Sequence, residues 1–203
     1  MRIAKSGFLV ISLHILLTFA LIFLIKIVKP FVIYVQFLTY GFIAFWFLIN
    51  ACFFKGSWNI SSNVKIFWLR VFGATLGKGI VIRPAVNIKY PWKLKVGNHC
   101  WIGEGVWIDN LDQVTLEDNV CISQGAYLLC GNHNYKSSSF DLMTAPIYLQ
   151  QGSWIGAKAI VGPGVTSGSH AVLALGAVAT KNLEPFTVYG GNPAIAIHKR
   201  EIL

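Results

Sequence analysis

The chain has 203 residues, of which 55% are hydrophobic and only 12% are charged, and its mean hydropathy is +0.58. Such a composition is too apolar for an ordinary soluble domain, so we expect part of the chain to contact lipid. The net charge of +9 comes from Lys and Arg residues scattered singly or in pairs, without the basic run of a nucleic-acid interface. An anionic membrane surface or an anionic ligand, such as a nucleotide cofactor, accounts for the charge equally well.

Two apolar runs open the chain, from Gly7 to Val28 and, after Lys29 and Pro30, from Phe31 to Phe54. Each is about long enough to cross a hydrocarbon core of roughly 30 Å at about 1.5 Å per residue. A signal peptide is the alternative for the first run, but no small-residue cleavage site follows it, and a second apolar run does. We therefore predict a membrane-embedded helical hairpin over residues 1–56, either spanning or re-entrant.

Positive charges flank this predicted hairpin and favour a cytoplasmic position for both of its ends. They are Arg2 and Lys5 before it and Lys55, Lys65 and Arg70 after it. Lys26 and Lys29, near the turn, weaken the argument for a spanning hairpin but not for a re-entrant one. Residues 57–75 contain the sequence VKIFWLRVFG, which suits either a short helix at the membrane interface or a helix that caps the following domain.

An aliphatic residue then recurs every six positions, which no helix can place on one face but short strands joined by tight turns can. These markers are Leu76, Ile82, Ile88, Val96, Ile102, Ile108, Leu116, Ile122, Leu128, Leu149, Ile155, Val161, Ser167, Leu173 and Ala179. Three hexapeptides make one triangular coil, so residues 76–181 are predicted to form a mainly β fold, a parallel β-helix of about five coils spaced about 4.8 Å apart. Residues 182–203 form a C-terminal extension.

Three interruptions of the period carry further information, because each follows the third hexapeptide of a coil. Beyond the regular step of six, there are two extra residues between Ile88 and Val96, two between Ile108 and Leu116, and fifteen between Leu128 and Leu149. All three insertions are therefore predicted at the same corner of the prism, where a loop leaves without disturbing the stacked core. The longest, residues 129–148, is the expected active-site loop.

His133 lies in this loop, within the sequence GNHNY. Imidazole exchanges a proton near neutral pH, so this side chain could take a proton from an alcohol and return it, as acyl transfer to a hydroxyl requires. A surface histidine without a role is the alternative. The cysteines at positions 52, 100, 121 and 130 lack a C-x-x-C spacing, which favours reduced thiols in a cytoplasmic setting.

Four segments make a resemblance specific: WIDNLDQVTLEDNVCISQGAYLLCGNHNY, FDLMTAPIYL, GSWIGAKAIVGPGV and YGGNPA. They resemble the colanic-acid type of exopolysaccharide O-acetyltransferase, one of the left-handed β-helix acyltransferases, which include maltose, galactoside and antibiotic acetyltransferases. The likeness covers roughly Leu69 to Arg200. It implies the left-handed sense of the β-helix, which the period does not report. The apolar N-terminal runs have no counterpart in the soluble relatives.

The resemblance implies an acetyl-CoA-dependent reaction with His133 as general base and no covalent acyl-enzyme. The cysteines then need no catalytic role, and Cys130 is read as a small buried side chain. It also implies a homotrimer with the active site between neighbouring prisms.

By the same resemblance, the expected CoA-binding residues are Trp154, Ala157, Leu175, Gly176, Thr180 and Lys181, with His198, Lys199 and Arg200 near the 3′-phosphate. A solvated surface charge is the alternative for Lys181 and Arg200. The candidate acceptor-binding residues are Asp109, Asn110, Ser123, Gln124, Asn132 and Asn134. For Asp109 and Asn110 the alternative is a role in shaping the turn.

Three other functions remain to be weighed. A γ-class carbonic anhydrase would need three zinc-binding histidines with a close pair, which the sequence lacks. A xenobiotic or small-sugar acetyltransferase would not require a membrane segment, and a non-catalytic assembly protein would not require GNHNY in a long loop.

The sequence therefore predicts a membrane-associated O-acetyltransferase that moves acetyl from acetyl-CoA to a sugar hydroxyl in bacterial surface polysaccharide biosynthesis. The expected acceptor is a lipid-linked or nucleotide-linked sugar, and neither a metal nor nucleic acid is expected. The expected location is the bacterial inner membrane, with the catalytic domain in the cytoplasm.

Overall fold

The computed structural model describes residues 3–202, with side chains at 23, 24, 26 and from 28 onward. The chain divides into two compact units, Met1–Trp46 and Phe47–Leu203. Helix α1 (Ile3–Ile49) begins in the first unit, and the β-helix lies in the second.

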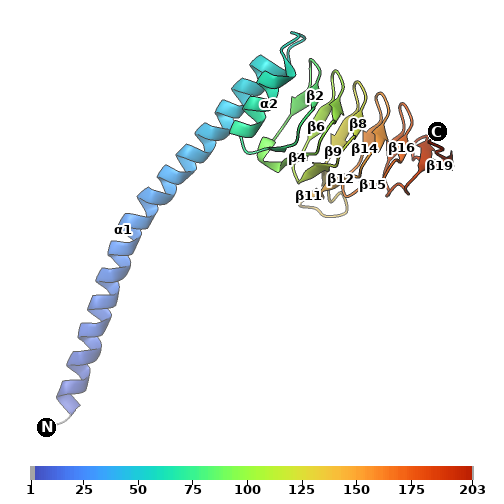
Figure 1. Cartoon of the computed structure of the whole chain (residues 1–203). Helices are drawn as coiled ribbons and strands as arrows, with labels where there is room; N and C mark the ends of the chain where they lie inside the picture. Colours follow the sequence, from blue (N-terminus) through green and yellow to red (C-terminus); the bar gives the residue numbers. More distant parts are fainter. Residues whose placement is uncertain (1–2, 203) are drawn as a thin grey trace. The chain divides into compact units, whose positions relative to one another are not determined.

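The predicted hairpin is not formed, because α1 is a single helix of 47 residues that contains Pro30 (Figure 1). Proline removes one backbone hydrogen bond, which costs about 3 kcal/mol in a helix in water. Helices in lipid tolerate proline, because the apolar surroundings favour every remaining helical hydrogen bond. The apolar pattern continues on both sides of Pro30, so the helix continues as well. Because the hairpin is absent, the inference that both of its ends lie in the cytoplasm no longer applies.

Within the described residues, one helical stretch is apolar and long enough to cross a membrane, judged by length and composition alone. It is Val28–Phe54, with 27 residues and a hydropathy of 1.9. Only 11% of its apolar window is buried, whereas the core helix of a soluble domain is mostly buried. The expectation of membrane contact is therefore supported, among the described residues, by this one helical stretch.

The end of this stretch belongs to the second unit and packs on the first coil. Helix η1 (Asn50–Phe54) is a π-helical turn whose Phe54 side chain is fully buried. The Asn50 Nδ2 group donates a hydrogen bond of 2.8 Å to Oδ1 of Asn87. The rings of Phe47 and Tyr90 meet edge to face. Residues 47–54 are therefore part of the folded second unit.

Helix α2 (Ser62–Val71) closes the open end of the first coil. Its N-cap, Ser61, accepts a hydrogen bond from the Asn63 backbone N–H. Lys65 is buried and donates to the carbonyl oxygens of Ile82 and Arg83, the latter at 2.7 Å. Burial, and then the charge of Arg83, lower the pKa of Lys65. The opposite face of α2 is apolar and exposed, with Phe67 as its largest side chain.

Three parallel sheets form the sides of the prism. The first contains β1 (Thr75–Leu76), β4 (Leu94–Val96), β7 (Val114–Leu116), β12 (Ile147–Leu149) and β15 (Thr166–Ser167). The second contains β2 (Val81–Ile82), β5 (Trp101–Ile102), β8 (Cys121–Ile122), β13 (Trp154–Ile155), β16 (Val172–Leu173) and β18 (Thr187–Gly190), followed by the antiparallel β19 (Ile195–Lys199). The third contains β3 (Asn87–Ile88), β6 (Trp107–Asp109), β9 (Tyr127–Leu129), β14 (Ile160–Val161) and β17 (Val178–Ala179).

The register confirms the predicted β-helix. On the second sheet, Ile82 pairs with Ile102, which pairs with Ile122, which pairs with Ile155. Every marker from Ile82 to Ala179 is buried. The strands complete five coils, and β18 begins a sixth. The residue that precedes each marker points outward, so one side of each sheet forms the core and the other forms the surface.

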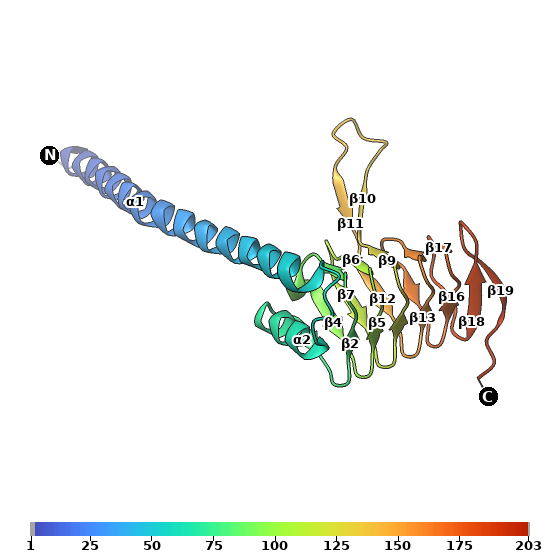
Figure 2. The ribbon, with the colours of Figure 1, turned by 90° about the horizontal axis from the view of Figure 1, so that it is seen from above.

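All three insertions leave the prism between the third and first sheets, as predicted. The first contains the short helix η2 (Pro91–Lys93). The third contains an antiparallel hairpin of β10 (Gly131–His133) and β11 (Leu142–Thr144). Figure 2 shows this hairpin projecting from the stacked coils. The predicted active-site loop thus leaves the stacked coils at this corner.

Candidate active site

The projecting hairpin is anchored to the core at its base. Cys130, which precedes β10, is fully buried, and its carbonyl oxygen accepts a hydrogen bond of 3.0 Å from the Ala145 N–H. The ladder then pairs Gly131 with Thr144 and His133 with Leu142. The two strands therefore carry His133 away from the prism in a fixed register.

The His133 ring is held by Phe140 from the other side of the loop. Its Nδ1 lies 2.9 Å from the Phe140 carbonyl oxygen, and the two rings stack with centroids 4.5 Å apart at 7°. Since a carbonyl oxygen can only accept, Nδ1 carries the proton of this hydrogen bond. In the neutral ring, Nε2 then keeps its lone pair. The geometry therefore leaves Nε2 as the basic atom of an exposed imidazole.

Phe140 holds this position through an unusual backbone conformation. Its φ is +48°, in the left-handed region that few residues other than glycine adopt. The backbone there is fixed by a hydrogen bond of 3.1 Å from the Phe140 N–H to the Ser137 carbonyl oxygen. Ser139 hydroxyl donates to the Asp141 carboxylate at 2.6 Å and contacts the Ser137 hydroxyl at the same distance. The polar residues of the loop thus shape the turn that orients His133.

The two asparagines beside His133 also form hydrogen bonds within the loop. Asn132 Oδ1 accepts from the His133 N–H at 2.8 Å, and Asn134 Oδ1 accepts from the Lys136 N–H at 3.2 Å. Both were expected to bind the acceptor. Their side-chain oxygens stabilise the hairpin, which places both residues at the site without assigning them a substrate contact.

Asp109 lies at the end of β6, below the base of the hairpin. Its carbonyl oxygen accepts from the Cys130 N–H at 3.2 Å, and its carboxylate forms an ion pair of 2.9 Å with Lys89. The Tyr127 hydroxyl lies 3.4 Å from the other carboxylate oxygen. Burial, followed by the charge of Asp109, raises the pKa of Tyr127 to about 12, so the phenol stays a donor. Trp107 stacks on Tyr127 with ring centroids 4.7 Å apart.

Asn110 is fully buried, and its side chain holds the first insertion. Oδ1 accepts from the Tyr90 N–H at 2.9 Å, while Nδ2 donates to the carbonyl oxygens of Tyr90 and Lys93 at 2.6 and 3.2 Å. Both amide protons are therefore used within the protein. These contacts favour the turn-shaping alternative for Asn110 over acceptor binding.

A groove of about 420 Å³ lies on the second sheet and its corner with the third, and it joins residues from both predicted sets. Its lining includes the candidate acceptor residues Ser123 and Gln124 and the candidate CoA residues Trp154, Ala157 and Leu175. The Trp154 indole N–H donates to the Ser123 hydroxyl at 2.9 Å. We call this the donor groove.

Backbone dominates the floor of the donor groove. A Cβ atom at Gly156 would lie 2.6 Å from the Leu175 backbone nitrogen, so only glycine permits this approach of two coils. Gly176 continues the same corner, with its N–H donating to the Ala157 carbonyl oxygen at 2.8 Å. Leu175 is 81% exposed and forms an apolar wall.

Thr180 and Lys181 lie at a different corner from the donor groove. They follow β17 on the third sheet and precede Leu183, which pairs with Ser167 of the first sheet. They therefore share their corner with the His133 hairpin. Within one chain, Thr180 and Lys181 are therefore separated from the predicted CoA residues of the donor groove.

The C-terminal cations are partly engaged by the protein. Lys199 Nζ donates to the Thr187 hydroxyl at 2.9 Å, and Arg200 Nη1 donates to the carbonyl oxygens of Gly152 and His170. His198 and Lys199 line a separate groove of about 250 Å³ beside β18 and β19. Arg200 is therefore not the free surface charge weighed from the sequence.

The cysteine nearest the hairpin is not set up as a nucleophile. Cys130 is fully buried, and burial raises the pKa of its thiol to about 11. This agrees with its expected place as a small buried side chain. Among the described residues, no group of three or more His, Cys, Asp or Glu side chains is arranged to hold a metal ion.

The sequence missed two features of the site. The run SSSF does not predict that the Phe140 carbonyl oxygen accepts a hydrogen bond from His133, because that contact depends on the left-handed backbone conformation of Phe140. Trp107 and Tyr127 could have been found, since each immediately precedes a marker and so must point outward from the third sheet.

A parallel β-helix of stacked hexapeptides, with an exposed histidine on a corner hairpin and a groove beside glycine-containing coils, is the arrangement of a hexapeptide-repeat acyltransferase. No family model matches the chain. It is 37% identical over 155 residues to the putative colanic acid biosynthesis acetyltransferase WcaF of Escherichia coli strain K12, and the match covers 76% of this chain and 85% of that protein. The chain belongs to the WcaF family of hexapeptide-repeat acetyltransferases.

Two further comparisons concern a curated relative and a solved structure with the same fold. The galactoside O-acetyltransferase of E. coli strain K12 is 28% identical over 129 residues, covering 62% of this chain and 64% of that protein. The hexapeptide-repeat acetyltransferase VCA0836 of Vibrio cholerae, solved with acetyl-CoA, superposes with a TM-score of 0.66 at 21% identity, covering 72% of this chain and 81% of that one. The prediction of a β-helical acetyltransferase is confirmed.

Proposed function

We propose that this protein is a membrane-attached O-acetyltransferase that transfers acetyl from acetyl-CoA to a sugar hydroxyl in bacterial surface polysaccharide biosynthesis. The observation that carries the proposal is the orientation of His133. Its Nδ1 proton is bound by the Phe140 carbonyl oxygen, so the free lone pair lies on Nε2 of an exposed ring. This is the arrangement that a general base for an alcohol requires.

In the proposed reaction, His133 Nε2 takes the proton of the acceptor hydroxyl as that oxygen bonds to the thioester carbonyl carbon. The C–S bond then breaks, and the imidazolium returns the proton to the departing thiolate of CoA. The Phe140 carbonyl oxygen stabilises the positive ring through the Nδ1 hydrogen bond. No thiol of the enzyme takes part, consistent with the raised pKa of Cys130.

The donor groove has the form expected for the pantetheine arm of acetyl-CoA. It is largely apolar, and two coils approach closely at Gly156 in its lining, so a thin chain can lie against it. His133 lies at another corner of the same prism. We therefore propose a homotrimer in which the hairpin of one subunit meets the donor groove of its neighbour.

A sugar acceptor is supported by the relatives and by the polar groups below the hairpin. WcaF is named for colanic acid biosynthesis, and the galactoside enzyme is named for a sugar acceptor. Asp109 and Lys89 offer an acceptor and a donor at the base of the hairpin. Sugar hydroxyl groups can form hydrogen bonds with both.

Membrane attachment is proposed through Val28–Phe54. Lys55 and Arg70 follow this stretch and favour a cytoplasmic catalytic unit by the positive-inside tendency. Lys65, counted with them in the sequence, is buried under the first coil and contributes no exposed charge. The proposed location is the cytoplasmic side of the bacterial inner membrane.

A free small sugar is the second candidate acceptor, because the galactoside enzyme shares 28% identity. Acetylation of a simple glycoside at a rate equal to that with a linked sugar would favour it.

The proposal is tested by release of CoA thiol from acetyl-CoA in the presence of nucleotide-linked and lipid-linked sugars. His133→Ala should lower turnover by about 10² or more, while the acetyl-CoA dissociation constant stays within about twofold. Lys136→Ala, in the same loop, is the matched control and should keep full turnover. Turnover by His133→Ala equal to that of the unaltered protein refutes the assignment.

A further inference from the structure

A second groove, of about 490 Å³, lies on the corner between the second and third sheets, below the donor groove. Its lining includes Arg83, Trp101, Glu104, Gln124 and Lys158. Gln124 also lines the donor groove, so the two grooves adjoin at this side chain. We call the second one the cationic groove.

The coils bring its two cations together from distant parts of the sequence. Arg83 lies in the first coil and Lys158 in the fourth, at the same corner. The corners stack through hydrogen bonds from Gly105 N–H to Pro84 at 3.1 Å and from Gly125 N–H to Glu104 at 2.7 Å. Lys158 N–H continues the series to Gln124 at 2.9 Å.

Gly125 lies between these cations and has no side chain that would fill the groove. Gly125 has a φ of +66°, and the Lys158 Cγ atom lies 3.3 Å from the place that a Cβ of residue 125 would take. The lysine stem therefore lies along the corner over Gly125. A larger residue at 125 would displace it.

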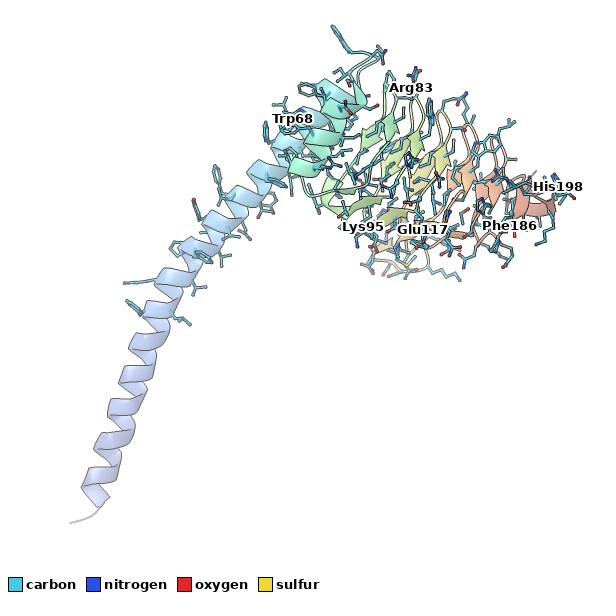
Figure 3. The ribbon with its side chains drawn as sticks, in the orientation of Figure 1. Trp68, Arg83, Lys95, Glu117, Phe186 and His198 are labelled. Carbon is cyan, nitrogen blue, oxygen red and sulfur yellow. The ribbon has the colours of Figure 1, made fainter. Side chains whose placement is uncertain are left out.

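Among the described residues, neither Arg83 nor Lys158 forms an ion pair. In the part of the chain that the structure describes, the only ion pair within 4.0 Å is Lys89–Asp109. Neither the Arg83 guanidinium nor the Lys158 ammonium donates a hydrogen bond to another described residue. Figure 3 shows Arg83 at the outer edge of the coils. Glu104 lines the same groove, so the three charged side chains leave one net positive charge.

The side chains that line the groove also indicate which part of a ligand would lie there. Arg83 carries five N–H donors in a planar fork that suits phosphate oxygens. Trp101 is 44% exposed and points outward from the second sheet, in the same column as Trp154 of the donor groove. A phosphorylated group held here would lie next to the donor groove.

We propose that the cationic groove binds the phosphate or diphosphate group of the acceptor. The acetylated sugar would then be an activated glycosyl phosphate ester, not a neutral glycoside or a finished polysaccharide. This inference rests on the proposed function and deepens it. The carrier of the diphosphate is a nucleotide or a polyprenol, which share this chemistry.

Binding of inorganic pyrophosphate to the full chain in detergent micelles, measured by calorimetry, tests the groove directly. Arg83→Gln and Lys158→Gln should each weaken pyrophosphate binding about tenfold, as the loss of a charge-assisted hydrogen bond predicts. Lys158→Arg should retain binding. Lys95→Gln removes an exposed charge from the first sheet and is the matched control, since Figure 3 shows Lys95 and Arg83 on opposite sides of the coils.

Two competitors distinguish the carriers. Displacement of pyrophosphate by uridine diphosphate glucose supports a nucleotide-linked acceptor, and displacement by farnesyl diphosphate in micelles supports a lipid-linked one. Unchanged pyrophosphate affinity in the Arg83→Gln, Lys158→Gln double variant overturns the inference. An equal loss of acetyl-CoA affinity in that variant also overturns it, because the groove would then serve the donor. Acetyl transfer to a neutral glycoside, measured in parallel, shows whether the proposed function survives either result.

Discussion

The side chain of Asn110 provides a test of how the insertion corner supports the active site. Asn110→Ala removes three hydrogen bonds, to Tyr90 N–H and to the carbonyl oxygens of Tyr90 and Lys93. The side chain is 0% exposed, so water cannot replace it without a rearrangement. At about 1 kcal/mol for each net hydrogen bond, the variant should lose about 3 kcal/mol of unfolding free energy. For a unit of this size, that corresponds to a fall in Tm of about 6 to 12 °C.

The assay is thermal unfolding of the full chain in detergent micelles, followed by tryptophan fluorescence. Protein concentration is kept constant, because assembly would make Tm depend on it. Asn134→Ala is the control for stability, since it loses a single hydrogen bond in the exposed hairpin and should shift Tm by less than about 3 °C. The acceptor KM of Asn110→Ala, measured well below its Tm, should equal that of the unaltered protein.

Two results would contradict this reasoning. A Tm within about 2 °C of the unaltered protein would mean that the three hydrogen bonds contribute little to stability. A raised acceptor KM without a change in Tm would mean that Asn110 contacts the sugar after all.

Three further predictions concern the thiol, the acid limit of stability and the N-terminal boundary. Cys130→Ala should keep turnover within about twofold in the thiol-release assay, because a thiol with a pKa of about 11 is protonated at neutral pH. A fall in turnover of about 10² would instead favour a covalent mechanism through this thiol. Hydrogen bonds from the Asn98 backbone and side chain lower the pKa of Asp118, so its stabilising contribution is present above the unfolded value of about 3.9 and is lost as the pH falls below it. Tm should therefore fall less steeply below about pH 4 in Asp118→Asn than in the unaltered protein, and equal slopes would count against this. Deletion of residues 1–45, which keeps the fully buried Trp46, should leave the catalytic unit folded. Deletion of residues 1–56 removes both Trp46 and Phe54, which are fully buried, and should lower its unfolding free energy by about 3 kcal/mol or more; equal Tm values for the two deletions would contradict this.

The β-helix could be predicted closely because its pattern is local and repeated. Each marker, such as Ile102, precedes a turn and pairs with residues of the same kind in adjacent coils, so one period specifies strand, turn and register together. The corner at which the insertions leave the prism followed from counting the residues between successive markers. The N-terminal hairpin was wrong because Pro30 was read as a chain reversal, whereas the helix continues through it.

The sequence by itself determined the coils, the corner at which the loop leaves and the identity of the histidine on it. The tertiary structure alone decided that the Phe140 carbonyl oxygen accepts a hydrogen bond from Nδ1 of that ring, that Asn110 is buried in the turn, and that Arg83 and Lys158 share a groove. The physical reason is the range of the interactions. Apolar periodicity acts over six residues, but the contacts that orient a base or gather two cations join residues whose separation in sequence is set by loops and stacked coils.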